Sequence, residues 1–397
     1  MAADFKFIVV GRGMMGAAAA RHLAGQSDGV AVIGPDEPED YRNHQGVFAS
    51  HYDEGRITRT IDPDADWARL ANQSIARYGE IEAQSEMTFY SEVGCLCVGP
   101  KRGGEDSYIA NVVAAADALK VRADLLDDVA LKVQFPFFSF AGENEGVHER
   151  QGAGYISPRR LVKAQSLIAE KSGATVLKET VISIREEDSL AIVTTVEGNR
   201  YSAEKVLMAA GGFSITESLL ATPVDLKVRG RTVVLFEISD ADAKAFAAMP
   251  SLIRKGHGKT DSIYLLPPIR YPDGKYYIKI GGDPDDFDLT TDADLRAWFR
   301  TDGRVAVKEH LTRIIHGLIP DLRPLSVSSH SCVTSYGPTD YPMIAYTASP
   351  HIAVMTGCGG SSAKSSDEIG RLGAELLLEG EIKDGGYRTD FAAHFIG

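Results

Sequence analysis

Residues 5–24 read FKFIVVGRGMMGAAAARHLA, and this stretch decides the fold that we expect for the start of the chain. Five of its first six residues are apolar, which is typical of a strand buried on both faces. Gly11, Gly13 and Gly16 follow with G-x-G-x-x-G spacing, and an alanine-rich helix that opens in this loop is predicted to end near Ala24. A strand, a glycine-rich turn and a helix in this order predict that the helix N-terminus binds the diphosphate of a dinucleotide.

The spacing gives each glycine a separate task in such a site. Gly11 permits a tight turn, and Gly13 lets the backbone approach the diphosphate closely. Gly16 allows the helix to pack closely on the strand. An acidic residue is expected where the second strand, Val30–Ile33, ends, because it would bind a ribose, but Gly34 stands there. Asp36 and Glu37 follow shortly after, and Asp36 is the predicted substitute.

Length and composition describe an ordinary globular chain of about two domains. The chain has 397 residues, 24% charged and 44% hydrophobic, with a net charge of −13. This net negative charge argues against nonspecific nucleic-acid binding. The sequence contains no run of about 18 apolar residues, so no membrane span is predicted. Four unevenly spaced cysteines are typical of a reducing compartment. We expect a cytoplasmic protein that is a monomer or a small homo-oligomer.

The chain alternates between two kinds of segment. Segments with buried strands and helices of the dinucleotide-binding kind are 1–88, 150–222 and 325–397. Segments with alternating and aromatic residues, typical of antiparallel strands, are 89–149 and 223–324. This pattern predicts an α/β fold, in which a discontinuous Rossmann-like cofactor domain carries an inserted, mostly antiparallel β domain that binds substrate. The active site is expected between the two domains.

Three local signals mark the edges of later elements. Ser157 and Pro158 are a predicted N-cap and first helical residue. Ser365 and Glu368 are a predicted capping box for the last helix. Asp273-Gly274 is the predicted turn of a β-hairpin.

Five further stretches follow the glycine-rich loop in a fixed order. They are ASHYDEGRITRT at 49–60, GYISPRRLVKA at 154–164, AEKVLMAAGG at 203–212, SCVTSYGPTDYPMI at 331–344 and TGCGGSSAKSS at 356–366. This order resembles the flavin amine oxidases of the D-amino-acid oxidase superfamily, most closely monomeric sarcosine oxidase and N-methyltryptophan oxidase. The resemblance covers nearly the whole chain, and it implies that the cofactor is FAD.

The resemblance also implies a reaction. The C–N bond of an amino acid or N-alkyl amino acid would be oxidised by hydride transfer to the flavin, and oxygen would reoxidise the flavin to give hydrogen peroxide. Three other functions stay open. They are a flavin dehydrogenase of the same fold that passes electrons to a quinone or carrier, a nicotinamide-dependent dehydrogenase, and a noncatalytic flavoprotein subunit of a larger complex.

Cys332 matches the position at which these oxidases attach the flavin through a thioether. The alternative is a buried strand cysteine, which is the commoner fate of a free thiol. The surroundings depart from the family pattern, because Thr334 stands where a tyrosine is usual. Covalent attachment through Cys332 is therefore a hypothesis about this chain.

Two arginines lie three residues apart at Arg56 and Arg59. The resemblance implies that Arg56 lies beside the flavin and that Arg59 binds the substrate carboxylate. A guanidinium suits the second task because it stays charged and can hold a carboxylate through two hydrogen bonds. The alternative is two exposed arginines that pair with Asp53 and Glu54.

Two lysines have implied roles as well. Lys279 matches the lysine that activates oxygen, where a fixed ammonium stabilises negative charge as it develops. Lys364 matches a lysine near one edge of the flavin ring, and with Arg59 it would hold the substrate carboxylate. The alternatives are a solvent-facing strand residue for Lys279 and an ordinary helix-start residue for Lys364.

The predicted catalytic residues are thus Lys279, Arg59 and Lys364. The predicted cofactor-binding residues are Gly11, Gly13, Met14, Met15, Gly16, Asp36, Arg56, Ala210, Gly211, Cys332, Gly359, Gly360 and Lys364. The other cysteines, Cys95, Cys97 and Cys358, are interpreted as packing residues, and their spacing predicts no metal site.

Acidic residues after the Lys279 strand suggest a substrate class. Asp283 stands where the resembled family has a histidine, and Asp285 and Asp286 lie close by. Carboxylates at this place would favour an amino acid with a polar or cationic side chain. The alternative is that they cap the turn and face water.

Overall fold

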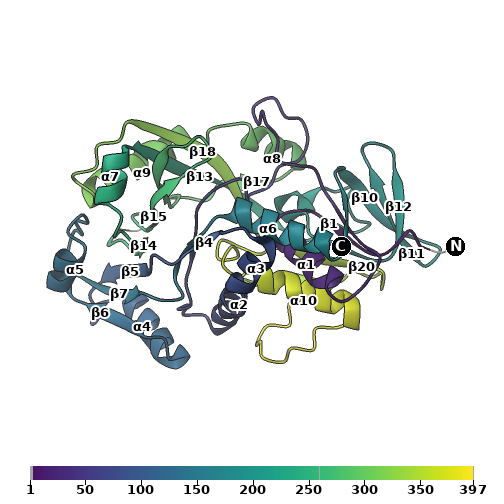
Figure 1. The fold of residues 1–397 in the computed structure, drawn as a ribbon, viewed down its shortest axis with the longest axis horizontal. Coiled ribbons are helices and arrows are strands. Elements are labelled where there is room, and N and C mark those ends of the chain that lie inside the picture. The colour runs from purple at the N-terminus through teal and green to yellow at the C-terminus, as the bar shows by residue number, and fades with distance from the viewer. Residues whose placement is uncertain (1–2, 259, 397) are drawn as a thin grey trace.

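The computed structural model describes residues 3–258 and 260–396. Two large β-sheets lie on opposite sides of the molecule, and one small sheet lies between them at the centre (Figure 1). The first sheet contains β1 (Phe5–Val10), β2 (Val30–Ile33), β9 (Thr175–Leu177), β10 (Val181–Glu187), β11 (Leu190–Thr195), β12 (Arg200–Met208), β19 (Met343–Tyr346) and β20 (Ile352–Thr356). The second contains β5 (Cys95–Pro100), β6 (Ala123–Leu126), β7 (Asn144–Glu149), β13 (Lys227–Ile238), β14 (Ser251–Arg254), β15 (Ile263–Arg270), β16 (Tyr276–Gly281), β17 (Asp288–Leu289) and β18 (Ser326–Tyr336). The small sheet contains β3 (Arg56–Thr58), β4 (Tyr90–Ser91) and β8 (Gly154–Ile156).

The helices divide between the two large sheets. Those near the first sheet are α1 (Met14–Ala24), α2 (Ala65–Ile75), α3 (Tyr78–Ser85), α6 (Pro158–Lys171) and α10 (Ser366–Glu379). Those near the second are α4 (Tyr108–Leu119), α5 (Asp128–Gln134), α7 (Asp240–Ala245), α8 (Asp292–Phe299) and α9 (Val305–Leu318). A short 3₁₀ helix, Gly211–Ile215, follows β12.

The first sheet has a parallel centre, as the buried apolar runs of the sequence predict. β1 lies between β2 and β12 and is parallel to both, and β9 and β20 continue the parallel pairing on either side. All four residues of β2 are buried, because helices cover the faces of a parallel sheet. The predicted strands Phe5–Val10 and Val30–Ile33 form with these bounds.

Close helix packing brings two glycine-rich loops together. A Cβ atom at Gly370 of α10 would lie 2.3 Å from the Cβ of Ala18 in α1, so only glycine permits this approach. The alanine side chains of α1 are small enough to allow the same contact. The packing places the loop 356–365, which precedes α10, beside the loop 11–16, which opens α1.

The second sheet is mostly antiparallel, as predicted, and β5 with β14 is its one parallel pair among the described strands. The hairpin of β15 and β16 turns at Gly274, whose φ of 84° suits glycine, and this confirms the predicted turn.

The predicted domain boundary between residues 324 and 325 separates one strand from the sheet in which it lies. β18 pairs with β13 from Ser326 to Tyr336, so the strand that carries Cys332 belongs to the second sheet. The alternation of polar and apolar residues in β18 predicts a strand but does not show which sheet it joins.

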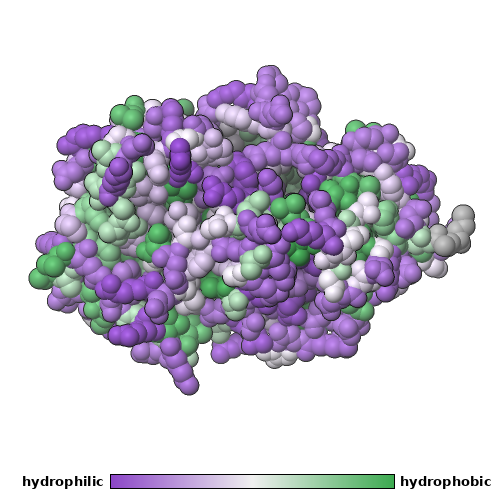
Figure 2. Space-filling view, viewed as in Figure 1, coloured by the Kyte–Doolittle hydropathy of each residue, from purple (hydrophilic) through white to green (hydrophobic). Residues whose placement is uncertain are grey.

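The surface is mainly hydrophilic on the face shown in Figure 2, where hydrophobic residues form small groups. One such group lies over α5, which exposes Val129 and Val133. None of the described helices is both long enough and apolar enough to cross a membrane.

Candidate active site

The glycine-rich loop has the geometry that its sequence predicts. Gly11 has a φ of 111°, and a Cβ atom there would lie 2.2 Å from the carbonyl oxygen of Ala209. A Cβ atom at Gly16 would lie 1.9 Å from the carbonyl oxygen of Gly11. Gly13 is the N-cap of α1 and offers no side chain to its N–H groups. These N–H groups are the donors that bind a diphosphate at a helix N-terminus.

This loop forms one wall of a cavity of about 330 Å³. Seven predicted cofactor residues line it, namely Gly11, Gly13, Met14, Met15, Ala210, Gly211 and Gly359. The others, Gly16, Asp36, Arg56, Cys332, Gly360 and Lys364, lie outside the lining, although Val333 and Thr334 next to Cys332 belong to it. The cavity therefore extends from the glycine-rich loop of the first sheet to β18 of the second.

Cys332 and Arg56 come together although 276 residues separate them. The Arg56 guanidinium donates a hydrogen bond to the Cys332 sulfur at 3.5 Å and another to the carbonyl oxygen of Ser50 at 3.0 Å. Cys332 is half-buried, so the interpretation as a fully buried strand cysteine does not describe it. Arg56 also forms an ion pair with Asp53, as the alternative interpretation of the arginines predicted. It is partly buried rather than exposed.

Lys279 is completely buried, which excludes the solvent-facing alternative. Its ammonium forms an ion pair with Asp53 and donates a hydrogen bond to the carbonyl oxygen of Gly55 at 2.8 Å. Burial and the nearby charge of Arg56 lower the pKa of Lys279 well below its usual value. The lysine thus lies beside the same arginine that contacts Cys332.

Arg59 and Lys364 share one internal carboxylate. Asp62 lies 2.9 Å from a guanidinium nitrogen of Arg59 and 3.1 Å from the Lys364 ammonium. Burial and the Arg59 charge lower the pKa of Lys364 to about 8. Glu54, the predicted alternative partner of the arginines, instead accepts hydrogen bonds from Arg159 and from the Ser157 hydroxyl. The two predicted carboxylate-binding cations are therefore adjacent, with two positive charges for one internal carboxylate.

The loop that carries Lys364 is fixed from behind. The Tyr78 hydroxyl donates a hydrogen bond to the carbonyl oxygen of Lys364 at 3.0 Å and lies 3.4 Å from the hydroxyl of Thr58 in β3. Thr58 lies in the strand that begins with Arg56, and Arg59 follows it directly in the sequence. Tyr78 therefore connects the strand of the arginines to the loop of the lysine.

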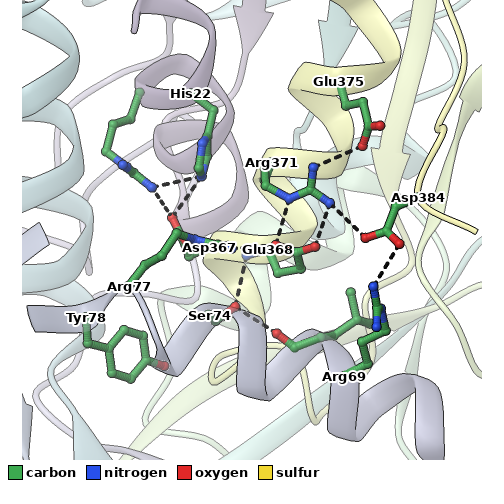
Figure 3. Close-up of polar contacts among 12 residues, drawn as sticks. His22, Arg69, Ser74, Arg77, Tyr78, Asp367, Glu368, Arg371, Glu375 and Asp384 are labelled. Carbon is green, nitrogen blue, oxygen red and sulfur yellow. Dashed lines mark hydrogen bonds and ion pairs between the residues drawn. The ribbon is translucent and has the colours of Figure 1, made fainter. Parts of the chain in front are cut away.

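Charged residues hold the start of α10, which follows this loop (Figure 3). Asp367 forms ion pairs with Arg21 at 2.7 Å and Arg77 at 2.5 Å, and Glu368 forms them with Arg77 at 2.5 Å and Arg371 at 2.7 Å. We call these five residues the helix cluster.

The predicted capping box of α10 is wrong. The Ser365 hydroxyl has no hydrogen-bond partner among the described residues, and the Glu368 carboxylate is occupied by arginines. The Ser74 hydroxyl of α2 accepts the Glu368 N–H at 2.9 Å instead (Figure 3). A tertiary partner replaces the local cap that the sequence suggests, whereas the Ser157 cap of α6 forms as predicted.

The three aspartates that were predicted to favour a polar or cationic substrate pair with arginines, and Asp285 and Asp286 are exposed to water, as the alternative interpretation predicted. Arg304 lies 3.4 Å from Asp283 and 2.8 Å from Asp285, and Arg231 lies 3.0 Å from Asp286. Asp283 is nearly inaccessible in addition. These carboxylates already have cationic partners inside the protein.

A family model described as "FAD dependent oxidoreductase" (DAO) matches residues 6–376. The chain belongs to this family. Its membership rules out the nicotinamide alternative for the glycine-rich loop.

Curated relatives of this FAD dependent oxidoreductase include a monomeric sarcosine oxidase of Bacillus sp. (strain NS-129), 24% identical over 96% of this chain and 95% of the relative. A probable sarcosine oxidase of Arabidopsis thaliana is 22% identical over 96% and 90%. Among solved structures, NikD, an unusual amino acid oxidase essential for nikkomycin biosynthesis, has a TM-score of 0.80 at 19% identity, over 100% of this chain and 99% of that one. The L-proline dehydrogenase of P. horikoshii has a TM-score of 0.76 at 16% identity, over 97% and 96%.

The cavity of this FAD dependent oxidoreductase fits its cofactor. The space above Gly13 is open. A Cβ atom added at Gly13 would have the Nδ1 atom of His51, 3.9 Å away, as its nearest neighbour. His51 Nδ1 is buried and has no partner among the described residues, and His51 lines the cavity. Burial lowers the pKa of His51 to about 3, so the neutral ring offers hydrogen bonding without charge.

The ribose end departs from the usual arrangement. Arg12 extends over Gly34, donates a hydrogen bond to its carbonyl oxygen at 2.9 Å, and pairs with Asp36 at 2.9 Å. Lys178 holds the same carboxylate at 2.7 Å. Asp36 therefore stays a predicted ribose ligand whose carboxylate already has two cationic partners.

Sequence reasoning missed part of the lining. The loop Val47–Tyr52 overlaps the segment 49–60, but its residues were not predicted individually. Asp292, Arg296 and Phe299 belong to α8, which lies near the second sheet. Helix α8 has an ordinary amphipathic sequence, so nothing in it signals a cavity.

Cys95 and Cys97 are buried in an apolar cluster, and Cys358 is buried too, as predicted, although it also lines the cavity.

Proposed function

We propose that the chain oxidises the C–N bond of an amino acid or N-alkyl amino acid, with oxygen as the electron acceptor and hydrogen peroxide as a product. The names of its relatives support an amine as the electron donor, because several are sarcosine oxidases. Bound FAD supplies the redox step, since it accepts a hydride from the substrate and passes two electrons to the acceptor.

The buried ammonium of Lys279 is the observation that carries the choice of oxygen. The fold alone does not distinguish acceptors, because a dehydrogenase and an oxidase both share it. A fixed cation stabilises the negative charge that develops when oxygen is reduced, and it does so best where water is excluded. Lys279 meets this condition because it is fully buried beside Arg56.

Arg59 and Lys364 are proposed to bind the substrate carboxylate. Asp62 neutralises one of their two charges, and the second is then available to an incoming anion. Arg59→Ala is expected to cost about 2–5 kcal/mol of transition-state binding for substrates with a carboxylate. The same variant is expected to change rates little for simple amines, which is the matched comparison.

A peroxide screen tests the proposal. Sarcosine, proline, alanine, lysine and arginine would be offered to the FAD-loaded protein, and peroxide release would be measured for each. Because arginines already occupy Asp283, Asp285 and Asp286, we expect neutral substrates to be oxidised faster than lysine or arginine. Flavin reduction without peroxide would instead support the dehydrogenase, and no flavin reduction by any amine would contradict the proposed donor.

Cys332 is proposed to attach the flavin covalently. Its half-buried sulfur next to the cavity wall and in contact with Arg56 supports this assignment. Flavin colour that stays with the acid-denatured protein is the expected result.

A further inference from the structure

Asp53 connects the residues proposed to serve oxygen. Its carboxylate forms ion pairs with both Lys279 and Arg56, although neither pairing follows from the family resemblance. Its other oxygen accepts hydrogen bonds from the Glu54 N–H and from the Tyr271 hydroxyl, each at 2.8 Å. The carboxylate is therefore held on both oxygens and is itself buried.

The electrostatic balance at Lys279 depends on this carboxylate. The titratable and charged groups that face the lysine are Asp53, Arg56, Tyr264, Tyr271, His330 and Cys332. Asp53 is the single carboxylate within ion-pair distance of the lysine in the part of the chain that the structure describes. Burial and Arg56 favour loss of the lysine proton, whereas a carboxylate in contact favours its retention.

We infer that Asp53 is a positioning residue that keeps Lys279 protonated and fixes its ammonium beside Arg56. An arginine does not lose its proton in proteins, so without Asp53 the lysine is the member of the pair that becomes neutral. A neutral amine would not stabilise negative charge on oxygen. This inference rests on the proposed role of Lys279 in the reaction with oxygen.

Asp53→Asn tests the inference, because the amide keeps the size of the side chain and removes its charge. The flavin would be photoreduced, so that no substrate is needed, and mixed with oxygen between pH 6 and 9. The wild-type reoxidation rate is expected to change little up to pH 8. In Asp53→Asn the midpoint should lie at lower pH than in the wild type, and the rate should fall about tenfold per pH unit above it and approach the wild-type rate at the acidic end of the range, as expected for a single titrating group.

Two further variants keep the test decisive. Asp53→Glu restores the carboxylate and is expected to restore the wild-type profile. Asp53→Ser keeps a hydroxyl for the Glu54 N–H, and it serves in place of Asp53→Asn if that variant does not fold. A uniform loss of rate at every pH, or no change at all, would mean that Asp53 does not control the lysine charge, and the inference would be wrong.

Stability gives a readout that does not depend on activity. If Lys279 is neutral in folded Asp53→Asn and charged when unfolded, the unfolded state binds one more proton, and stability rises with pH from the lowered pKa towards about 10. Denaturant midpoints of the flavin-loaded protein should therefore rise with pH in Asp53→Asn but not in Asp53→Asn/Lys279→Met.

The two readouts separate the inference from the proposed function. Should wild-type and Lys279→Met flavins react equally fast with oxygen, the proposed role of the lysine fails. The pH dependence of stability would still decide whether Asp53 sets the lysine charge, and its absence would overturn the inference.

Discussion

Two buried groups of charges differ in which member can change its charge. In the helix cluster of Arg21, Arg77, Asp367, Glu368 and Arg371, each carboxylate contacts more than one arginine. In the lysine cluster, which we define as Asp53, Arg56 and Lys279, one carboxylate serves two cations.

The pKa shifts of the two clusters follow from this composition. Its cationic neighbours lower the pKa of Asp367 despite the opposing effect of burial, so it stays ionised. Burial lowers the pKa of Lys279, so its charge depends on the neighbours. Burial of charge is therefore not itself a sign of catalysis. The feature that indicates a catalytic role is a titratable cation in a cluster that contains fewer carboxylates than cations.

The largest expected effect belongs to the helix cluster. Asp367→Asn leaves arginines buried without a full counter-charge, and we expect a loss of about 3–5 kcal/mol in the free energy of unfolding. Denaturant unfolding at neutral pH would measure it. Because the folded-state pKa of Asp367 is lowered, its contribution is fully present above about pH 4 and lost as the pH falls further.

Asp384 offers a matched control. It also pairs with arginines, Arg69 and Arg371, but it is 23% exposed. Asp384→Asn is expected to cost about 1 kcal/mol or less. Equal losses for the two variants would contradict the structural role assigned to the helix cluster.

Lys279→Met is the corresponding change in the lysine cluster. Loss of one fixed charge is expected to slow flavin reoxidation by oxygen about 10²–10³-fold and to leave anaerobic reduction by substrate nearly unchanged. Stopped-flow absorbance measures both half-reactions. A comparable loss in the reductive half would show that the lysine supports the site in general and does not serve oxygen.

Lys364 should give a smaller, pH-dependent effect. Because its pKa is lowered to about 8, it is charged below this pH and becomes neutral above it. The affinity for a carboxylate without an amine, such as propionate, should fall as the pH rises through 8, by up to about tenfold per unit. Perturbation of the flavin absorbance would report binding. Lys364→Arg should abolish this dependence, and its persistence would assign the titration to another group.

Cys332→Ala is expected to have the smallest effect on stability. The glycine-rich loop is predicted to bind the cofactor independently of any thioether, so the variant should still bind FAD, and acid denaturation should release it. Mass spectrometry of a digest identifies the attachment site in the wild type. Flavin found on a different residue would refute the assignment.

The N-terminal part of the fold could be predicted because its signals are local. A strand, three glycines at fixed spacing and an alanine-rich helix determine β1, the loop and α1, and the helix needs those small residues to meet Gly370. The pairing of Arg56 with Cys332 could be anticipated only through the order of segments that the resemblance supplied, because 276 residues separate them.

The missed features all depend on tertiary contacts. Asp53 reaches Lys279 across 226 residues, and Asp62 joins Arg59 to Lys364 although nothing in its local sequence marks it. The polar alternation of β18 likewise does not reveal its partner β13. Side-chain partners of this kind are set by how the two sheets meet, and spacing along the chain does not encode them.

The lysine cluster serves oxygen only if electrons from a C–N bond reach oxygen in this protein. The decisive measurement mixes the flavin-loaded wild type anaerobically with the best substrate of the peroxide screen, and then admits oxygen. We predict that the flavin absorbance bleaches in the first step and returns in the second, with one hydrogen peroxide formed for each flavin reoxidised. Bleaching that oxygen does not reverse, but that a quinone or carrier does, would contradict this prediction and identify a dehydrogenase.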